Sequence, residues 1–494
     1  MTETKKYPLE FRGTKLFSLI PLICFAAFCV LLFVIYKVFE MEGLAMAGVV
    51  SIMIGSLFAK DMAEYWKAVV KGMSSDMAAT LALILFVVGI FSKLMTRGGV
   101  AEGFVWLGSS LGLQGPVFIV FTFVAVCIIA SSTGTSIGTL FSCFPIFYPS
   151  GILLGAHPLY LAGAILSGAI FGDNVAPISD TTIASASTQY YRTKHECADI
   201  GGVVTSRMSY ALIAALGACV LFMLFGSGGE YQVAGAEILA QYTNAKGLLM
   251  LIPVAVLLAV AIVKRDIFIA ITVGIVTGIV IGLGFSIITP ADIMSIQDGT
   301  LQGFMIDGIK NMLGTVGYLY GVFGIMGVLQ GCGMMDDIIT GLTGSSFAKS
   351  IVGSELIIGF GIMISSIFLG SANGPAIIMY GPIANEIGQS KGLHPYRRAN
   401  LLDGFASTLP VLIPFTSAFI FIVIACVNGL MDSYDFIDPI NPFSLAFATF
   451  HCWLLFIVFM ISVFTGKGRR YEDKNGKTTK DPAEAYLGPN KVNV

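Results

Sequence analysis

Long apolar segments, separated by short polar ones, run along almost the whole chain. A membrane-spanning helix needs about 20 apolar residues, and segments of that length recur between residues 16 and 465. They fall into two halves with the same order: three helices, an apolar pair interrupted by small residues, a helix interrupted by proline, and a last helix. In the first half we predict these elements at 16–38, 43–59, 76–95, 116–149, 157–190 and 203–225. In the second half we predict them at 247–264, 267–285, 311–330, 354–388, 395–425 and 443–465.

The second half repeats the first. A constant offset pairs Pro145 with Pro382, His157 with His394, Pro158 with Pro395 and Pro177 with Pro414. Prolines that recur at one spacing indicate an internal duplication. Five transmembrane helices per half is an odd number, so the two halves would cross the bilayer in opposite orientations. We therefore predict an all-α polytopic membrane protein of two inverted-topology repeats, repeat A at 16–225 and repeat B at 246–466.

The positions of Lys and Arg predict the orientation of the chain, because short cytoplasmic loops hold most of them. The predicted inner segments contain Lys5, Lys6, Arg12, Lys15, Lys60, Lys67, Lys71, Arg192, Lys194, Arg207, Lys264, Arg265, Lys391, Arg397 and Arg398. The segments 226–245 and 431–442 contain no Lys or Arg. We predict an extracytoplasmic loop at 226–245, and a cytoplasmic N-terminus at 1–15 and tail at 467–494. The chain would lie in the cytoplasmic (inner) membrane, with its polar tail solvated.

The apolar pairs at 116–149 and 354–388 are each predicted to be a re-entrant hairpin. Each arm has about 13 to 16 apolar residues, and at 1.5 Å per residue such an arm is shorter than a hydrocarbon core of about 30 Å. Two full spans would return the chain to the same side, so the charge pattern does not separate the two arrangements. Length favours the hairpins.

The composition agrees with a membrane protein and excludes several other classes. Of 494 residues, 56% are hydrophobic and only 12% are charged, with a mean hydropathy of +0.85. Nine scattered cysteines without C-x-x-C spacing give no sign of a disulfide framework or a zinc site. The sequence has no H-E-x-x-H motif, nucleophile elbow or phosphate-binding loop, so we expect no enzyme and no cofactor beyond coupling ions.

The strongest polar interruption lies in the first broken helix, in GDNVAPISDTT at 172–182. A carboxylate at membrane depth is costly, so it normally pairs, lines a cavity or binds a cation. Pro177 frees backbone carbonyls in the preceding turn, and broken transporter helices use such carbonyls to coordinate Na⁺. The predicted cation ligands in this segment are Asp173, Asn174, Ser179, Asp180 and Thr181. The alternative role for Ser179 or Asp180 is to cap the next half-helix.

Hydroxyl side chains gather at the tip of the first predicted hairpin, in SSTGTS at 131–136. Backbone at membrane depth must be buried or must line a cavity, where hydroxyls and carbonyls can coordinate an ion. Tight packing of Ser and Thr between helices is the alternative. The predicted cation ligands at this tip are Ser132, Thr133, Thr135 and Ser136.

The second half keeps the same breaks but loses the carboxylates. Pro410 and Ser417 stand where the first half has Asp173 and Asp180. Neutral donors and half-helix N-termini suit an anionic group such as a substrate carboxylate. The predicted substrate-binding residues are Ser371, Asn373, Gly374, Thr408, Thr416 and Ser417. Asp403 either couples transport or forms a structural ion pair with Arg397 or Arg398.

TGTSIG at 133–138 and FGDNVAPISDTT at 171–182 resemble the paired signature of the NhaC-type Na⁺/H⁺ antiporter family, which belongs to the ion transporter superfamily. The second half is similar but looser, because Phe415 and Thr416 stand where the family usually has Trp and Asn. The resemblance implies inverted repeats with two re-entrant hairpins and two broken helices, working as an elevator-type homodimer. It also implies antiport of Na⁺ against H⁺, or movement of organic acids or amino acids.

These observations predict an ion-coupled secondary active transporter that works by alternating access. Na⁺ and H⁺ can compete for one buried carboxylate, and that competition is the minimum that Na⁺/H⁺ exchange requires. The transporter would exchange these ions or use Na⁺ to move a small organic solute, an amino acid or a carboxylate. A channel is the alternative, since re-entrant loops also build selectivity filters. The expected partners are the ion or solute substrate, the lipid bilayer and a second copy of the chain, and no nucleic acid.

Overall fold

The computed structural model covers the whole chain and describes most of it. The described residues are 7–36, 38, 40–194, 196–226, 242–264, 266–297, 299–343 and 349–488. The predictions that concern residues 1–6, 227–241, Arg265 and 489–494 lie outside the described residues.

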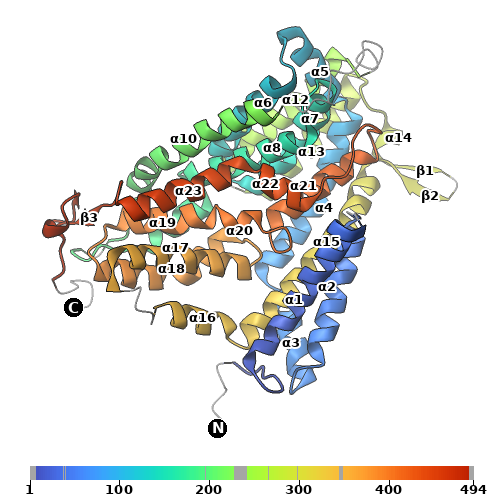
Figure 1. The fold of residues 1–494 in the computed structure, drawn as a ribbon. Coiled ribbons are helices and arrows are strands. Elements are labelled where there is room, and N and C mark those ends of the chain that lie inside the picture. The colour runs from blue at the N-terminus through green and yellow to red at the C-terminus, as the bar shows by residue number, and fades with distance from the viewer. Residues whose placement is uncertain are drawn as a thin grey trace.

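Helices make up most of the described structure (Figure 1). The first half contains α1 (Ile20–Val30), α2 (Met41–Ser56), α3 (Met62–Met73), α4 (Asp76–Arg97), α5 (Val100–Leu111), α6 (Gly115–Thr133), α7 (Ser136–Leu153), α8 (Pro158–Val175), α9 (Asp180–Ser187) and α10 (Ile200–Phe225), with η1 (Lys15–Leu19) and η2 (Leu31–Tyr36) flanking α1. The second half contains η3 (Ala245–Met250), α12 (Leu251–Lys264), α13 (Ile267–Gly284), α14 (Pro290–Ile293), α15 (Phe304–Gly331), α16 (Met334–Thr343), α17 (Ile351–Phe368), α18 (Asn373–Ser390), α19 (Pro395–Ala406), α20 (Leu409–Leu412), α21 (Ala418–Met431), α22 (Pro442–Ala448) and α23 (Phe450–Thr465). Two small antiparallel hairpins, β1 (Ser295–Gln297) with β2 (Thr300–Gln302) and β3 (Tyr471–Glu472) with β4 (Thr478–Thr479), and η5 (Pro482–Glu484) complete the described elements.

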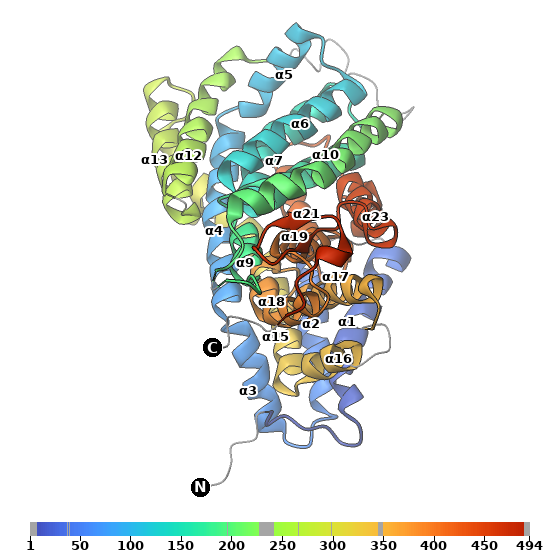
Figure 2. The same cartoon turned by 90° about the vertical axis from the view of Figure 1, so that its left-hand side faces the viewer.

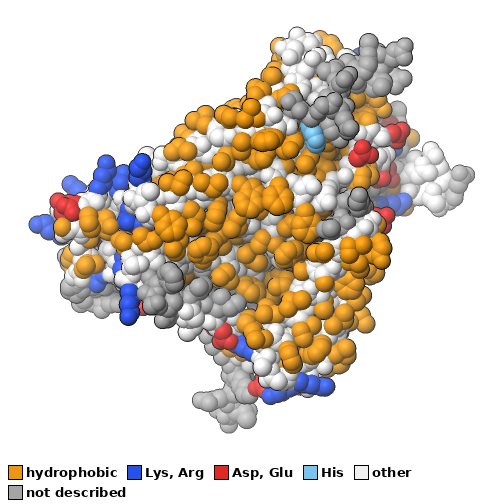
Figure 3. Space-filling view, in the orientation of Figure 1, with side chains coloured by type: hydrophobic (Ala, Val, Ile, Leu, Met, Phe, Trp, Pro, Cys, Tyr) orange, Lys and Arg blue, Asp and Glu red, His pale blue; other side chains and the backbone are white. Residues whose placement is uncertain are grey.

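The prediction of a mostly helical membrane protein is confirmed. Among the described residues, eight helices are long and apolar enough to cross a membrane, or nine if the bent pair of α22 and α23 counts as one span. The predicted helix at 443–465 is this bent pair, which turns by 54° at Thr449. Figure 3 shows hydrophobic side chains across the middle of the molecule, with Lys and Arg gathered at its left and lower margins. Such a broad apolar surface suits contact with lipid.

One group of helices is a bundle built around α15, which contacts α2, α3 and α4 (Figure 1). Glycines allow this close packing. A Cβ atom added at Gly72 would lie 2.1 Å from the carbonyl oxygen of Phe323, and one at Gly89 would lie 2.2 Å from that of Gly308. Small residues at helix contacts let backbones approach in the membrane, where apolar burial gives no driving force between helices. The bundle therefore depends on glycine at these contacts.

Gly72→Ala is expected to lower the free energy of unfolding by about 1–3 kcal/mol, because the added methyl group would force α3 away from α15. Thermal unfolding of the purified protein in detergent would measure this loss. Gly341→Ala is the matched control, since a Cβ atom there would meet nothing within 4 Å. Equal unfolding temperatures for the two variants would contradict the role of Gly72.

A second group of helices contains both paired helices and both broken helices. In it α6 and α7 contact α8, and α17 contacts α18 and α19. Figure 2 shows α12 and α13 on the outer side of the molecule, next to α4. The two groups meet where α21 contacts α7, α15 and α4. This arrangement brings the turns of both helix pairs and the breaks of both broken helices together inside the molecule.

The paired helices are longer than predicted. Helix α6 has 19 residues, and α7, α17 and α18 have 18 each, in place of arms of 13 to 16 residues. The predicted arm length was wrong, because the pairs expected at 116–149 and 354–388 stop short of the ends of α7 at Leu153 and of α18 at Ser390. Pro145, Pro149 and Pro382 lie within these helices. Length alone therefore does not separate hairpins from full spans.

The C-terminal segment is folded against the body, so the expectation of a fully solvated tail is wrong. Tyr471 and Glu472 are buried. The Glu472 carboxylate accepts hydrogen bonds from the backbone N–H groups of Arg192 and Thr193 and from the Thr193 hydroxyl. The His394 N–H donates to the carbonyl of Arg470. These long-range contacts could not be read from the polar composition of the segment.

Candidate cation and solute site

The turn between α6 and α7 meets the break between α8 and α9 at Asp173. The Ser136 hydroxyl donates to Asp173 Oδ2 at 2.8 Å, and the Ser179 hydroxyl donates to Asp173 Oδ1 at 2.6 Å. Pro177 has no N–H to continue the helix, so α8 ends at Val175 and the chain turns before α9. The buried carboxylate is thus held by one hydroxyl from each of two separate predicted segments.

The start of α9 combines the two roles that the sequence left open. Ser179 is the N-cap residue, and its hydroxyl accepts a hydrogen bond from the Thr181 N–H at 3.2 Å while it also contacts Asp173. The Thr181 hydroxyl lies 2.9 Å from the Ser179 hydroxyl. Asp180 Oδ1 accepts a hydrogen bond from the Thr181 N–H at 2.9 Å. Capping and site geometry therefore depend on the same side chains.

Asp180 reaches across to the second half of the chain. A Cβ atom added at Gly374 would lie 2.8 Å from Asp180 Oδ2, so the carboxylate lies against the first turn of α18. Asn373 begins α18, and free N–H groups at a helix N-terminus favour negative charge. The absence of a side chain at position 374 permits this contact between the two halves.

These segments enclose a cavity of about 340 Å³, called here the central cavity. Its lining residues come from α4 and α12, from the turns of both helix pairs and from the starts of α9, α13 and α21: Leu81, Thr133, Gly134, Thr135, Ser136, Ile137, Asp173, Ile178, Asp180, Thr181, Ala261, Asp266, Gly370, Ser371, Ala372, Asn373, Gly374, Ala418 and Phe419. The N-termini of α7, α9, α18 and α21 all contribute to it. The lining includes three carboxylates, and no Lys or Arg among the described residues. Carboxylate, hydroxyl and backbone oxygens are the ligands that hard cations prefer.

Most of the sequence-predicted site residues line the central cavity or touch its walls. Ser371 lines it with a positive φ of 64°, and its hydroxyl donates to the Pro410 carbonyl at 2.6 Å. Asn373 accepts a hydrogen bond from the Ser366 hydroxyl at 2.5 Å. Ser417 caps α21 next to the cavity-lining Ala418. These contacts place neutral donors from the second half opposite the carboxylates of the first.

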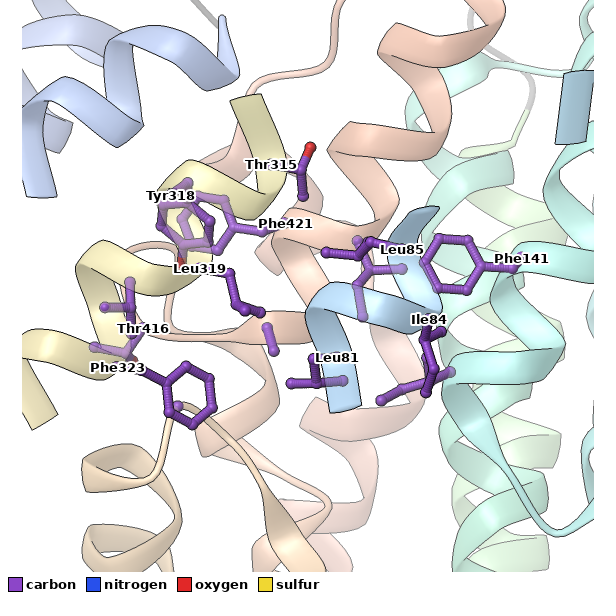
Figure 4. Close-up of a pocket in the computed structure, with 15 residues that line it drawn as sticks. Leu81, Ile84, Leu85, Phe141, Thr315, Tyr318, Leu319, Phe323, Thr416 and Phe421 are labelled. Carbon is purple, nitrogen blue, oxygen red and sulfur yellow. The ribbon is translucent and has the colours of Figure 1, made fainter. Parts of the chain in front are cut away.

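Seven predicted residues do not line the central cavity. Ser179 and Ser417 adjoin its wall, and Asp403 lies in a buried ion pair. The other four are Ser132, Asn174, Thr408 and Thr416. The Ser132 side chain is exposed and donates to the Ile128 carbonyl of its own helix. Asn174 is buried, and its carbonyl accepts a hydrogen bond from Arg207 at 2.6 Å. The Thr408 hydroxyl donates to the Phe405 carbonyl at 2.6 Å. Thr416 lines an adjoining apolar cavity of about 20 Å³ (Figure 4), and its buried hydroxyl has no hydrogen-bond partner among the described residues.

An ion pair between Arg207 and Asp403 ties the two broken helices together. Both side chains are fully buried. The Arg207 guanidinium on α10 also donates to the carbonyl of Asn174, at the broken end of α8, and to the side chain of Asn400 on α19. The predicted partners of Asp403, Arg397 and Arg398, are wrong, and Arg207 is not a loop charge. Asp403 pairs with Arg207 because both side chains are buried, and a buried carboxylate is stable only beside a compensating cation.

A second buried cluster joins Glu355 to two arginines. Arg397 Nε donates to Glu355 Oε1 at 2.7 Å, and Arg469 donates to Glu355 Oε2 at 2.6 Å. Glu355 lies in the apolar segment that forms α17, and an acidic residue in such a segment was a signal that the sequence reading missed. Arg398 instead donates to the carbonyls of Asn385 and Tyr190.

Known proteins match the chain in sequence. The profile of the Na⁺/H⁺ antiporter family matches residues 9–227, which include Ser136, Asp173 and Asp180. Residues 9–227 of the chain are therefore similar to the Na⁺/H⁺ antiporter family. The resemblance seen in TGTSIG and FGDNVAPISDTT is therefore confirmed.

The curated proteins that resemble the chain carry different names. A malate-2H⁺/Na⁺-lactate antiporter of Bacillus subtilis is 25% identical over 61% of this chain and 65% of its own length. The Na⁺/H⁺ antiporter NhaC of Alkalihalophilus pseudofirmus is 23% identical over 60% of this chain and 66% of its own length. An arginine/ornithine antiporter, ArcD, of Halobacterium salinarum is 22% identical over 79% of this chain and 83% of its own length. The matched segments thus cover just under two thirds of the length of the malate-2H⁺/Na⁺-lactate antiporter and of NhaC.

Proposed function

We propose that this protein is a member of the Na⁺/H⁺ antiporter family, and an ion-coupled antiporter in which Asp173 binds Na⁺ and H⁺ alternately. The observation that supports this best is the position of the Asp173 carboxylate, held between Ser136 and Ser179 at the wall of the central cavity. A cation there would find oxygen ligands from two segments at once. The family and the names of the relatives agree with this function.

Exchange follows from competition for one carboxylate. Na⁺ bound at Asp173 excludes the proton from that carboxylate, and the proton in turn removes the negative charge that holds Na⁺. The two serine hydroxyls can donate to the free carboxylate, as they do in the structure, or turn their lone pairs toward Na⁺. We propose Asp180, Thr181, Thr133 and Thr135 as the further ligands from the cavity wall.

Coupled movement of a small organic solute is the second candidate. The central cavity of about 340 Å³ is far larger than a bare Na⁺ needs and falls within the range of small-molecule sites. We propose Ser371, Asn373 and Gly374, at the start of α18, and Ser417, at the start of α21, as its polar contacts. Relatives named for malate and lactate and for arginine and ornithine support a solute of this size.

We also propose the finer architecture that such transport requires. Inverted repeats at 16–225 and 246–466 would supply one helix pair and one broken helix each, and the pairs would be re-entrant because their turns are buried. Thr133 and Ser136 in the first turn, and Ser371 in the second, are nearly inaccessible. An inner-membrane homodimer with cytoplasmic termini would agree with the Lys and Arg positions.

Flux measurements in proteoliposomes would test the function. An imposed Na⁺ gradient is expected to drive proton movement that a pH-sensitive dye inside the vesicles reports. A panel of amino acids and carboxylates would then separate simple Na⁺/H⁺ exchange from solute antiport, since a pure exchanger moves none of them. Saturable counterflow is expected for either antiporter, and unsaturable conductance would instead indicate a channel.

Gly374→Ala is expected to weaken Na⁺ binding roughly 10-fold, because the added methyl group would push the Asp180 carboxylate off the first turn of α18. The Na⁺ concentration for half-maximal flux would measure the change. Gly284→Ala is the matched control, because a Cβ atom there meets nothing within 4 Å. An unchanged Na⁺ dependence in Gly374→Ala would show that the Asp180 contact has no part in cation binding.

A further inference from the structure

A second polar cavity lies where α23 ends, apart from the central cavity and sharing no residue with it. This basic cavity has a volume of about 450 Å³ and is lined by Gly466, Lys467, Gly468, Arg469, Arg470, Tyr471 and Lys480. Four of these seven residues are cationic and none is acidic. The turn that forms it packs closely against α10, because a Cβ atom at Gly468 would lie 1.9 Å from the Tyr210 hydroxyl oxygen.

Among the described residues, three of the four cations in the basic cavity have no acidic partner in an ion pair. The charge of Arg469 is neutralised by Glu355. Arg470 Nη1 donates to the carbonyl of Arg469, which leaves its positive charge uncompensated. In the part of the chain that the structure describes, no ion pair joins Lys467, Arg470 or Lys480 to an Asp or Glu.

The acids nearby in the sequence are held by other donors. Glu472 accepts from the backbone N–H groups of Arg192 and Thr193. Asp473 accepts from the backbone N–H groups of residues 475 and 477. Glu484 accepts from the Thr479 hydroxyl at 2.5 Å. In the part of the chain that the structure describes, these carboxylates therefore accept from neutral donors and form no ion pair with Lys467, Arg470 or Lys480.

An apolar face of α23 leads directly to this cavity. Ile457, Ile461 and Phe464 are 48%, 53% and 62% exposed, and their spacing of four and three residues puts them on one side of the helix. In a membrane protein such a face contacts lipid chains. Figure 3 shows the same arrangement at the left margin of the molecule, where basic side chains follow the hydrophobic surface. A lipid whose chains lay on this face would place its headgroup at the basic cavity.

We propose that the basic cavity binds the phosphate headgroup of an anionic phospholipid, with Lys467, Arg470 and Lys480 as its ligands. Basic pockets at the ends of membrane helices suit such headgroups, since each cation adds electrostatic attraction to the negative leaflet. Free phosphate offers the same group without chains. The lipid is favoured because the exposed face of α23 continues into the cavity.

Titration of the full-length protein in neutral detergent would test this site. Short-chain phosphatidylglycerol is expected to bind more tightly than phosphatidylcholine of the same chain length, measured by microscale thermophoresis. Lys467→Gln with Lys480→Gln should weaken phosphatidylglycerol binding roughly 10- to 30-fold. Lys474→Gln with Lys477→Gln is the matched control, since it removes the same charge from the same segment outside the cavity. All four lysine side chains are exposed, so neither variant disturbs packing.

The binding measurements either support or overturn the assignment of the basic cavity as a phospholipid site. Loss of affinity in the first pair alone, with inorganic phosphate and glycerol phosphate binding far more weakly, supports a lipid site. Equal losses in both pairs would overturn the proposal, because general surface charge would then explain the binding. Inorganic phosphate that competes as well as the phospholipid would overturn the lipid assignment.

Discussion

Asp173→Asn is expected to reduce Na⁺-dependent proton flux at least about 100-fold. The substitution keeps the size of the side chain and an oxygen that can accept from Ser136 or Ser179, but it removes the negative charge that faces the central cavity. Removing one partner of a buried charge pair costs about 3–5 kcal/mol, which exceeds a factor of 100 in affinity. Dye-reported flux in proteoliposomes, over a range of Na⁺ concentrations, would measure the loss.

Asp266→Asn provides the matched control for this prediction. Asp266 lines the same cavity, and its carboxylate caps α13 by accepting from the Ile269 N–H at 3.0 Å. Asparagine is an equally good N-cap residue, so the variant removes one charge from the cavity while the helix start stays intact. We expect a change of less than about 10-fold. Flux that survives Asp173→Asn, or that falls equally in both variants, would rule out Asp173 as the ion-binding carboxylate.

Asp403→Asn is expected to lower the free energy of unfolding by about 3–5 kcal/mol. The variant would leave the Arg207 guanidinium buried without its counter-charge, and breaking a buried ion pair from one side carries this cost. The double variant Arg207→Met with Asp403→Leu should recover most of the loss, because both charges are then absent. Thermal unfolding of the purified protein in detergent would compare the three proteins.

Two further comparisons test whether Asp403 has a structural role or a role in ion coupling. Asp337→Asn removes a partner from the exposed pair with Lys15, and we expect less than about 1 kcal/mol there. Wild-type stability in Asp403→Asn would contradict a structural role for the buried pair. A double variant that folds but transports nothing would show that Asp403 also couples ion movement to the change between states.

The local breaks in the helices could be read from the sequence. His157 and His394 each precede proline, and each serves as the N-cap residue of a helix, α8 and α19. Pro177 and the polar residues around it end α8 two residues earlier, at Val175. These features act through the nearest backbone hydrogen bonds and through the cost of burying polar groups in an apolar segment. Both effects depend on a few consecutive residues.

Features that depend on distant neighbours could not be read in the same way. The helix arms were predicted too short, and α7 continues through Pro145 and Pro149 to Leu153 in a largely buried position. Ser132 and Thr133 are adjacent hydroxyls, yet only Thr133 faces the central cavity. A helix turns by about 100° per residue, so neighbouring side chains point in different directions, and the packing partner decides which one enters the site.

The sequence by itself determined the class of the protein and the two carboxylates at the first break, because apolar length, proline and buried charge are properties of short segments. Only the tertiary structure decided the partners: Ser136 with Asp173, Asp180 with Gly374, and Arg207 with Asp403. Some of these pairs lie up to about 200 residues apart in the chain. Such pairs form because packed helices leave each buried polar group only the neighbours that the fold brings within reach.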